Sequence, residues 1–222
     1  MKSIHAVEWA ITGRCNMNCR HCLNRGEERV ECTREHLDGI AKMLVSEEVS
    51  RVTLTGGEPL LSPHLERIVC RLTGGGISVQ LITNGLLLDA AKARTLKRAG
   101  LNFVWLSLDG TESTHDTVRS HHGSFKKVMD ASRHLRATGL PFGYMTTLLA
   151  TNFKELPAMA QLADTMGATA QQVWLGIPTG ADVPFLSSRH SSRLYPLMNE
   201  AAQLFSGFCI GDNVGYGPKW DA

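Results

Sequence analysis

Long apolar runs, strong net charge and an N-terminal targeting signal are all missing from this sequence. No run of apolar residues approaches the roughly 20 that a membrane-spanning helix needs. Lysine and arginine total 23 against 21 aspartates and glutamates, a net charge of +2, so we expect neither nucleic acid nor a membrane surface as a partner. The first residues carry a lysine but no apolar signal core, and we therefore expect a cytoplasmic protein.

Cysteine is too sparse and too unevenly placed for a disulfide framework. The 222 residues contain six cysteines, and Cys32, Cys70 and Cys209 lie far from one another in the sequence. We expect these three to be small apolar side chains buried in the protein. The chain length fits one domain, and 43% hydrophobic with 20% charged residues is the balance of a globular protein with a substantial core.

The other three cysteines lie together in the stretch from Thr12 to Leu23. Cys15, Cys19 and Cys22 are separated by three and then two residues. Three thiolates at this spacing suit a cubane iron–sulfur cluster whose fourth iron has no protein ligand. A structural zinc site needs four ligands, and His21, the candidate fourth, is wedged between two of the cysteines. We favour the iron–sulfur cluster; a zinc knuckle and three unrelated thiols remain the alternatives.

Strand-like and helix-like patterns alternate along the chain. Strands are predicted at residues 6–12, 51–55, 77–83, 102–108, 142–149 and 170–177. Helices are predicted to begin after the caps Thr33, Ser62 and Ser124, with Pro63 as the first residue of the second one. Three further helices are predicted to span about 89–98, 152–166 and 188–205. This alternation predicts an α/β fold with a parallel sheet, a partial (β/α)6 TIM-like barrel over residues 1–206. A loop is predicted between Gly110 and Ser124, and an irregular tail over 207–222.

Glycine-containing turns follow several of these strands. They are Gly56-Gly57-Glu58-Pro59, Ile82-Thr83-Asn84-Gly85 and Ser107-Leu108-Asp109-Gly110. Active sites of such barrels form where strands run into the following helices, which is also where the cysteine loop lies. The run 74–76 is glycine-rich too, but it follows a helix and so lacks the helix N-terminus of a phosphate loop. We therefore expect one site at the end of the sheet shared by the cysteine loop and the three turns.

The cysteine loop after the first strand, combined with Gly-Gly-Glu-Pro, resembles the radical S-adenosylmethionine (radical SAM) enzymes, over about residues 5–180. The run His115-Asp116-Thr117-Val118-Arg119, followed by Gly123-Ser124-Phe125, resembles the subgroup that modifies peptides and proteins. Many members of that subgroup carry a cysteine-rich C-terminal extension called the SPASM domain, and residues 207–222 contain no run of cysteines. The chain is either a member without this extension or a shortened form that stops at its start; the sequence leaves both open.

The resemblance implies a [4Fe-4S] cluster held by Cys15, Cys19 and Cys22, with S-adenosylmethionine (SAM) chelating the fourth iron. Electron transfer into SAM would then yield methionine and a 5′-deoxyadenosyl radical that abstracts hydrogen from carbon. An electron donor such as flavodoxin or ferredoxin is implied as a partner. The partial barrel is also the fold of this family.

The resemblance further implies which residues bind SAM. Gly56 and Gly57 would leave backbone carbonyls free for its ammonium group, and Glu58 would add negative charge there. A surface carboxylate is the alternative for Glu58. We expect a side chain at Gly57 to weaken SAM binding while the cluster remains. Asn84 and Ser107 offer polar groups to the ribose or carboxylate, with turn chemistry as the alternative.

Further candidates come from later in the chain. Arg119 suits a carboxylate because its guanidinium is a flat fork of donors, and a solvated loop arginine is the alternative. Thr147 and Leu175 lie near the ends of the fifth and sixth strands, so fold position puts them near the ribose and adenine. We expect Asp109 to be structural. His21 stands where the family usually has an aromatic residue before the last cysteine, and a histidine can still pack on the adenine.

We therefore predict a radical SAM enzyme that abstracts hydrogen from a peptide or protein substrate, forming a crosslink or inverting a stereocentre. The open side of a six-stranded barrel suits an extended polymer. The chain begins a few residues before its first strand, which leaves no room there for a leader-binding domain. We therefore expect recognition to be helped by a separate leader-binding protein or by a missing C-terminal extension. The alternatives are a zinc or iron–sulfur binding module without turnover, and a truncated inactive relative. No catalytic residue is assigned.

Overall fold

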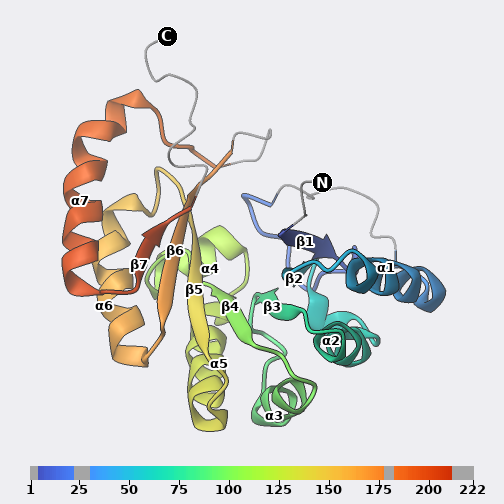
Figure 1. Cartoon of the computed structure of the whole chain (residues 1–222). Coiled ribbons are helices and arrows are strands. Elements are labelled where there is room, and N and C mark those ends of the chain that lie inside the picture. Colours follow the sequence, from blue (N-terminus) through green and yellow to red (C-terminus); the bar gives the residue numbers. More distant parts are fainter. Residues whose placement is uncertain (1–4, 23–30, 178–182, 212–222) are drawn as a thin grey trace.

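The computed structural model describes residues 5–22, 31–177 and 183–211. These residues form one seven-stranded sheet, in which neighbouring strands are parallel and follow the order of the chain. Figure 1 shows the sheet curling into an open half-barrel with its helices on the outer side. The predicted α/β partial barrel is confirmed.

The elements follow the predicted alternation of strand and helix. The strands are β1 Ala6–Ala10, β2 Arg51–Thr55, β3 Ser78–Thr83, β4 Phe103–Ser107, β5 Phe142–Leu148, β6 Ala170–Leu175 and β7 Phe208–Ile210. The helices are α1 Arg34–Ser46, α2 Leu65–Gly74, α3 Ala90–Arg98, α4 Glu112–Arg119, α5 Ser124–Thr138, α6 Leu156–Met166 and α7 Ser191–Leu204. The short 3-10 helices are η1 Pro59–Leu61, η2 Phe153–Glu155 and η3 Ser188–His190.

The hydrophobic core fills the space between the sheet and its helices. Alternate strand residues face this core and are fully buried, as Val52 and Leu54 on β2 and Val79 and Leu81 on β3 illustrate. The residues between them on these two strands face the other way and are half-buried or exposed. The concave side of the sheet is therefore left as surface on which a ligand can lie.

β7 and α4 lie where the sequence predicted no regular structure. β7 pairs with β6 and adds a seventh strand from the segment predicted as an irregular tail. Residues 212–222, the rest of that tail, lie outside the described residues. α4 occupies the predicted loop. Only His115 and Val118 of this helix are buried, so the helix has no apolar repeat by which the sequence would reveal it.

Helix starts were predicted correctly where a side chain caps the helix. Thr33 and Asp89 each accept a hydrogen bond from a backbone N–H of the following turn, at 3.2 and 2.7 Å. α2 instead begins at Leu65 without a side-chain cap, so the predicted start at Ser62–Pro63 is wrong by a few residues.

The expectation that the isolated cysteines are buried is wrong. Cys70 and Cys209 are exposed, and Cys32 is half-buried. No helix in the described part of the chain is long and apolar enough to cross a membrane.

Candidate functional site

The predicted site residues line two adjoining hollows where the strands end. The cysteine hollow, about 160 Å³, is lined by Cys15, Cys19, Cys22, Gly56, Gly57, Glu58, Asn84, Ser107 and Arg119, among others. The rim hollow, about 500 Å³, is lined by Cys22, Gly56, Ser107, Arg119, Thr147 and Leu175, among others. His21 and Ile82 also line both hollows. The structure thus brings the cysteine loop, the three turns and the ends of β5 and β6 together.

The turn after β2 holds the cysteine loop through backbone contacts. The N–H groups of Gly57 and Glu58 donate to the carbonyls of Thr12 and Arg14, at 2.8 and 2.7 Å. A Cβ atom at Gly57 would lie 2.2 Å from the carbonyl oxygen of Arg14. The space that glycine leaves at this position is therefore filled by the cysteine loop, and not by a ligand as the sequence suggested.

Glycine at the preceding position is required for two reasons. Gly56 has φ of +143°, a conformation that side chains rarely adopt, and a Cβ there would lie 2.3 Å from the carbonyl oxygen of Thr12. No described residue donates a hydrogen bond to the carbonyls of Gly56 or Gly57. These two acceptors stay available at the wall of the cysteine hollow.

Glu58 is buried, with 1% of its surface exposed, which rules out a surface carboxylate. Its carboxylate accepts the N–H of Leu60, the hydroxyl of Thr83 and the N–H of Asn84, at 3.0, 2.7 and 2.8 Å. Burial raises the pKa of Glu58, although these hydrogen bonds favour its charged form. The carboxylate thus ties the turn after β2 to the turn after β3.

Asn84 extends this connection to the cysteine loop. Its side-chain amide donates to Oδ1 of Asn16 at 2.8 Å, and its own Oδ1 accepts the N–H of Leu86 at 3.0 Å. The side-chain amide of Asn84 therefore stabilises its own turn and also links that turn to the cysteine loop. Asn16, one residue after the first cysteine, was not predicted as part of the site, because nothing in the sequence pairs it with a residue so distant.

Asp109 is a fully buried centre of polar contacts, in line with the structural role expected for it. One carboxylate oxygen accepts the N–H of Thr147 at 2.8 Å. The other lies 2.6 Å from the Arg119 guanidinium and 3.5 Å from Nε2 of His21. Burial disfavours the charged carboxylate, but Arg119 with His21 and His115 outweighs it and holds the pKa of Asp109 below its ordinary value.

The Arg119 side chain is 11% exposed and is paired, so the solvated alternative is excluded. Its guanidinium contacts Asp109 and lies 3.9 Å from the sulfur of Cys19. Burial raises the pKa of the Cys19 thiol, and the nearby Arg119 charge opposes that shift. Nε of Arg119 is also buried, and has no hydrogen-bond partner among the described residues.

His115, Asp116 and Arg119 of the His-Asp-x-x-Arg run all contact other protein residues. Nδ1 of His115 accepts the N–H of Asp109 at 3.1 Å, and burial lowers the pKa of this histidine to about 4. Asp116 accepts the N–H of Phe125 and the hydroxyl of Ser124, each at 2.8 Å. Ser124 is therefore a donor to Asp116 within the first turn of α5, and not the helix cap predicted for it.

A third hollow continues down the concave face of the sheet below the rim hollow. This lower hollow, about 350 Å³, is lined by Ala6, Val7, Glu8, Arg51, Thr53, Gln80, Ile82, Trp105, Met145, Gln172, Trp174 and Cys209. Sequence reasoning missed these residues as a group. Their signal is the alternation of strand residues, since most of them occupy the positions between those buried in the core.

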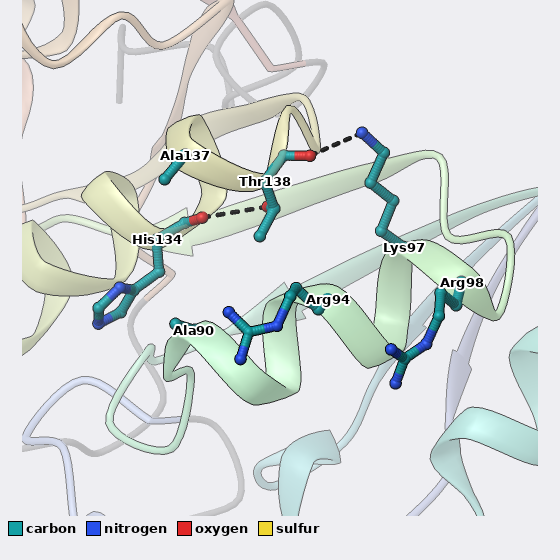
Figure 2. A pocket seen from close by; sticks show the side chains of 7 residues that line it. All are labelled: Ala90, Arg94, Lys97, Arg98, His134, Ala137 and Thr138. Atoms are coloured by element: carbon teal, nitrogen blue, oxygen red, sulfur yellow. Dashed lines mark hydrogen bonds between the residues drawn. The ribbon is translucent and has the colours of Figure 1, made fainter.

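Another hollow lies outside the half-barrel, between α3 and α5 (Figure 2). It measures about 570 Å³ and is lined by Ala90, Arg94, Lys97, Arg98, His134, Ala137 and Thr138. Nζ of Lys97 donates to the carbonyl of Thr138 at 2.6 Å, which ties the two helices together. None of the predicted site residues lines this hollow, so it is not part of the site.

The Radical SAM superfamily model matches residues 9–163. The chain therefore belongs to the radical SAM superfamily, whose members are enzymes that use a [4Fe-4S] cluster and S-adenosylmethionine. The recognition made from the cysteine loop and the Gly-Gly-Glu-Pro turn is confirmed.

Relatives of known activity differ in what they make. The AdoMet-dependent heme synthase of Methanosarcina barkeri is 34% identical over 179 residues, which cover 78% of this chain and 51% of the relative. The PqqA peptide cyclase of Gluconobacter oxydans is 32% identical over 164 residues, covering 71% of this chain and 45% of the relative. The chain spans about half the length of the curated relatives it matches.

Solved structures share the fold at low sequence identity. SuiB of Streptococcus suis bound to S-adenosylmethionine has a TM-score of 0.80 at 11% identity, covering 94% of this chain and 51% of SuiB. The enzyme anSMEcpe with bound AdoMet and the Kp18Cys peptide has a TM-score of 0.75 at 18% identity, covering 88% of this chain and 59% of that one. These likenesses concern the fold alone.

The residues present fit the cofactors of the family. The three cysteines line one hollow. Three thiolates suit a cubane cluster better than a structural zinc ion, which takes four ligands. The free carbonyls of Gly56 and Gly57 and the unpartnered Nε of Arg119 suit an ammonium and a carboxylate.

Proposed function

We propose that this chain cleaves S-adenosylmethionine reductively and directs the resulting 5′-deoxyadenosyl radical at a carbon–hydrogen bond of a peptide or protein. The observation that carries the proposal is the meeting of the cysteine loop with the turns after β2, β3 and β4 around one hollow. Membership of the radical SAM superfamily supports the same chemistry. An electron donor of the flavodoxin or ferredoxin kind and a separate leader-binding protein are part of the proposal.

The protein residues bind and orient the cofactors. The cluster, when held by Cys15, Cys19 and Cys22, supplies the electron that breaks the sulfonium–carbon bond of SAM. The carbonyls of Gly56 and Gly57 would accept from the SAM ammonium group. Ser107, Thr147 and Leu175 would line the adenosine, while the carboxylate of Glu58 and the amide of Asn84 hold the turns that carry these contacts.

Two features favour a peptide over a small metabolite. Among the described strands, β1 and β7 each pair on one side only, which leaves the half-barrel open. The PqqA peptide cyclase is a sequence relative, and a SuiB structure bound to the precursor peptide SuiA has a TM-score of 0.81 to this chain. An open concave face accepts an extended chain more readily than an enclosed pocket does.

A tetrapyrrole is the second candidate substrate, because the heme synthase of M. barkeri is the relative with 34% identity. Heme-type macrocycles carry several carboxylates, which cationic side chains would have to match. In the described lining of the three concave hollows the only arginines are Arg51 and Arg119, and Arg119 is already paired with Asp109. The lining therefore suits a less acidic substrate.

The test is anaerobic incubation of the purified chain with SAM and dithionite. We expect a brown protein that contains iron and sulfide and forms 5′-deoxyadenosine, detected by liquid chromatography and mass spectrometry. Cys22→Ala should lose the colour and the product, while Cys70→Ala, a cysteine on the outer surface, should keep both. A colourless zinc protein, or an iron-loaded protein that leaves SAM intact, would contradict the proposal.

The substrate class is tested in the same assay. Candidate peptides should raise the yield of 5′-deoxyadenosine and change in mass, or in stereochemistry at constant mass. A metal coproporphyrin as the competing additive should leave the yield at its basal level. Stimulation by the porphyrin and by none of the peptides would assign the chain to tetrapyrrole chemistry.

A further inference from the structure

Two tryptophan side chains lie on the concave face, each against a glycine of a neighbouring segment. Trp105 on β4 is the cross-strand partner of Gly143 on β5. A Cβ at Gly143 would lie 2.8 Å from Cζ3 of Trp105, and a Cβ at Gly211 would lie 2.6 Å from Cδ2 of Trp174. Each glycine therefore makes room for an indole ring on the wall of the lower hollow.

Trp105 is held in place by further contacts. Its indole N–H donates to Oε1 of Gln80 at 2.9 Å, and its ring centroid lies 4.8 Å from that of Phe103. The indole N–H is thus already hydrogen-bonded, and the ring lies against Gly143 of β5. The ring also lines the lower hollow. Aromatic rings fixed in this way offer their faces to a cation.

The lower hollow opens upward into the rim hollow. The two share Glu8, Ile82, Met145 and Trp174, so they adjoin along these four side chains. This connection places the lower hollow within reach of a substrate whose neighbouring residue lies at the rim.

Glu8 is the charged group at the place where the two hollows adjoin. It lines both hollows, whereas Arg51 lines only the lower one. Glu8 is exposed and forms no ion pair with any described residue, while Arg119 at the rim is paired with Asp109. Glu8 is thus the one charged side chain among the described residues that line both hollows.

We infer that the lower hollow is a specificity site for a lysine or arginine side chain of the substrate, with Glu8 as its counter-charge and Trp105 and Trp174 as its aromatic walls. A carboxylate beside aromatic rings matches a cation on a long apolar stem, because the rings cover the stem and attract the charge. The peptide nature of the ligand rests on the proposed function. The anchored basic residue would hold a neighbouring residue at the rim.

The experiment compares three blocked glycine tripeptides that carry lysine, norleucine or glutamate in the centre. Their dissociation constants for the full chain are measured by NMR titration at low salt. We expect lysine to bind about tenfold more tightly than norleucine, and glutamate more weakly than either. Equal affinities for lysine and norleucine, or tightest binding of glutamate, would overturn the inference.

Variants assign the preference to its residue. Glu8→Gln should bring the lysine peptide to the affinity of the norleucine peptide. Arg51→Gln, which removes a charge from the same hollow, should keep the preference for lysine. A lysine preference that survives Glu8→Gln in folded protein would overturn the assignment of Glu8 as the counter-charge. If Glu8→Gln fails to fold, the wild-type comparison of the three peptides still decides the question.

Failure of the proposed function would be seen separately. It would appear as wild-type protein, loaded with iron, that forms no 5′-deoxyadenosine from SAM and dithionite. A lysine preference in that protein would keep the site while removing the enzyme activity. Formation of 5′-deoxyadenosine without any lysine preference would keep the enzyme and remove the site.

Discussion

At the scale of single residues, Asp109 illustrates how one buried carboxylate organises several segments. It accepts from the backbone of β5 through Thr147 and pairs with Arg119 at the end of α4. His21 of the cysteine loop approaches the same oxygen as Arg119. Removing the carboxylate would leave a buried guanidinium without its partner, which is costly because a charge in a low-dielectric interior needs compensation.

His115 makes the stability of the folded protein depend on pH below neutrality. Its pKa is about 4 in the folded protein against 6.5 for an ordinary histidine, so the unfolded chain binds the proton more readily. The stability from the neutral imidazole is present above pH 6.5 and is lost as the pH falls toward 4. We expect the free energy of unfolding to drop by about 2 kcal/mol between pH 7 and pH 5 from this group.

His115→Asn tests this, because an amide oxygen can accept the Asp109 N–H without titrating. Urea unfolding at several pH values should give a shallower pH dependence for this variant. His36→Asn, an exposed histidine on α1, should keep the wild-type slope. An unchanged slope in His115→Asn would show that this histidine is not the group responsible.

The sequence predicted which residues meet at the site, but not what they contact. Arg119 and Glu58 were expected to face the cofactor, and the structure gives each of them protein partners instead. Those partners come from other turns of the sheet. Pairings of this kind depend on how strands are arranged in space, and a single sequence does not report them.

At the scale of elements, the cysteine loop lies directly against the turn after β2. Two backbone hydrogen bonds join them, from Gly57 and Glu58 to Thr12 and Arg14. The absence of a side chain at Gly57 is what allows the approach. The position of the loop therefore depends on the turn.

Gly57→Ala should consequently disturb the cysteine loop itself. The new Cβ would clash with the carbonyl oxygen of Arg14. This oxygen belongs to the backbone, so no change of side-chain rotamer can relieve the clash. We expect iron loading to fall together with SAM binding, measured by iron content and by isothermal titration. Gly39→Ala in α1, where a Cβ meets nothing within 4 Å, should keep both. Full iron content with weakened SAM binding would restore the view that glycine makes room for the ligand.

Element prediction succeeded where local patterns are strong and failed where tertiary contacts decide. In β1 to β6 the residues alternate between apolar and polar or are apolar throughout. Thr33 and Asp89 are typical N-cap residues and mark the starts of α1 and α3. α4 lacks such a pattern, and β7 has three residues whose strand geometry depends on pairing with β6. Neither is encoded by periodicity within its own residues.

At the scale of the whole molecule, the sheet formed by the described residues has two edge strands. Within that part of the chain, β1 and β7 are each hydrogen-bonded on one side only, whereas β2 to β6 are paired on both. The first edge strand runs directly into the cysteine loop, and the last is three residues long. The two edge strands are therefore the strands held by the fewest hydrogen bonds between strands. Their free sides are where another segment or a partner would pair.

Amide hydrogen exchange should distinguish the edge strands from the central strands. We expect the slowest exchange in β3, β4 and β5, and the fastest strand amides in β7 and β1, because opening an edge strand breaks one ladder and not two. Mass spectrometry of peptic fragments at neutral pH measures it. Protection of β1 equal to that of β4 would mean that the edge is covered in solution.

The contacts of residues 12–22 also bear on how the protein acquires its metal. The turn after β2 holds Thr12 and Arg14, Asn84 holds Asn16, and the carbonyl of Val118 accepts the N–H of Arg20 at 2.9 Å. Hydrogen bonds from the barrel thus hold the loop at four of its residues. We therefore expect metallation to begin from a preorganised template, so that the affinity for the cluster carries little of the entropy loss that a disordered cysteine segment would suffer on binding.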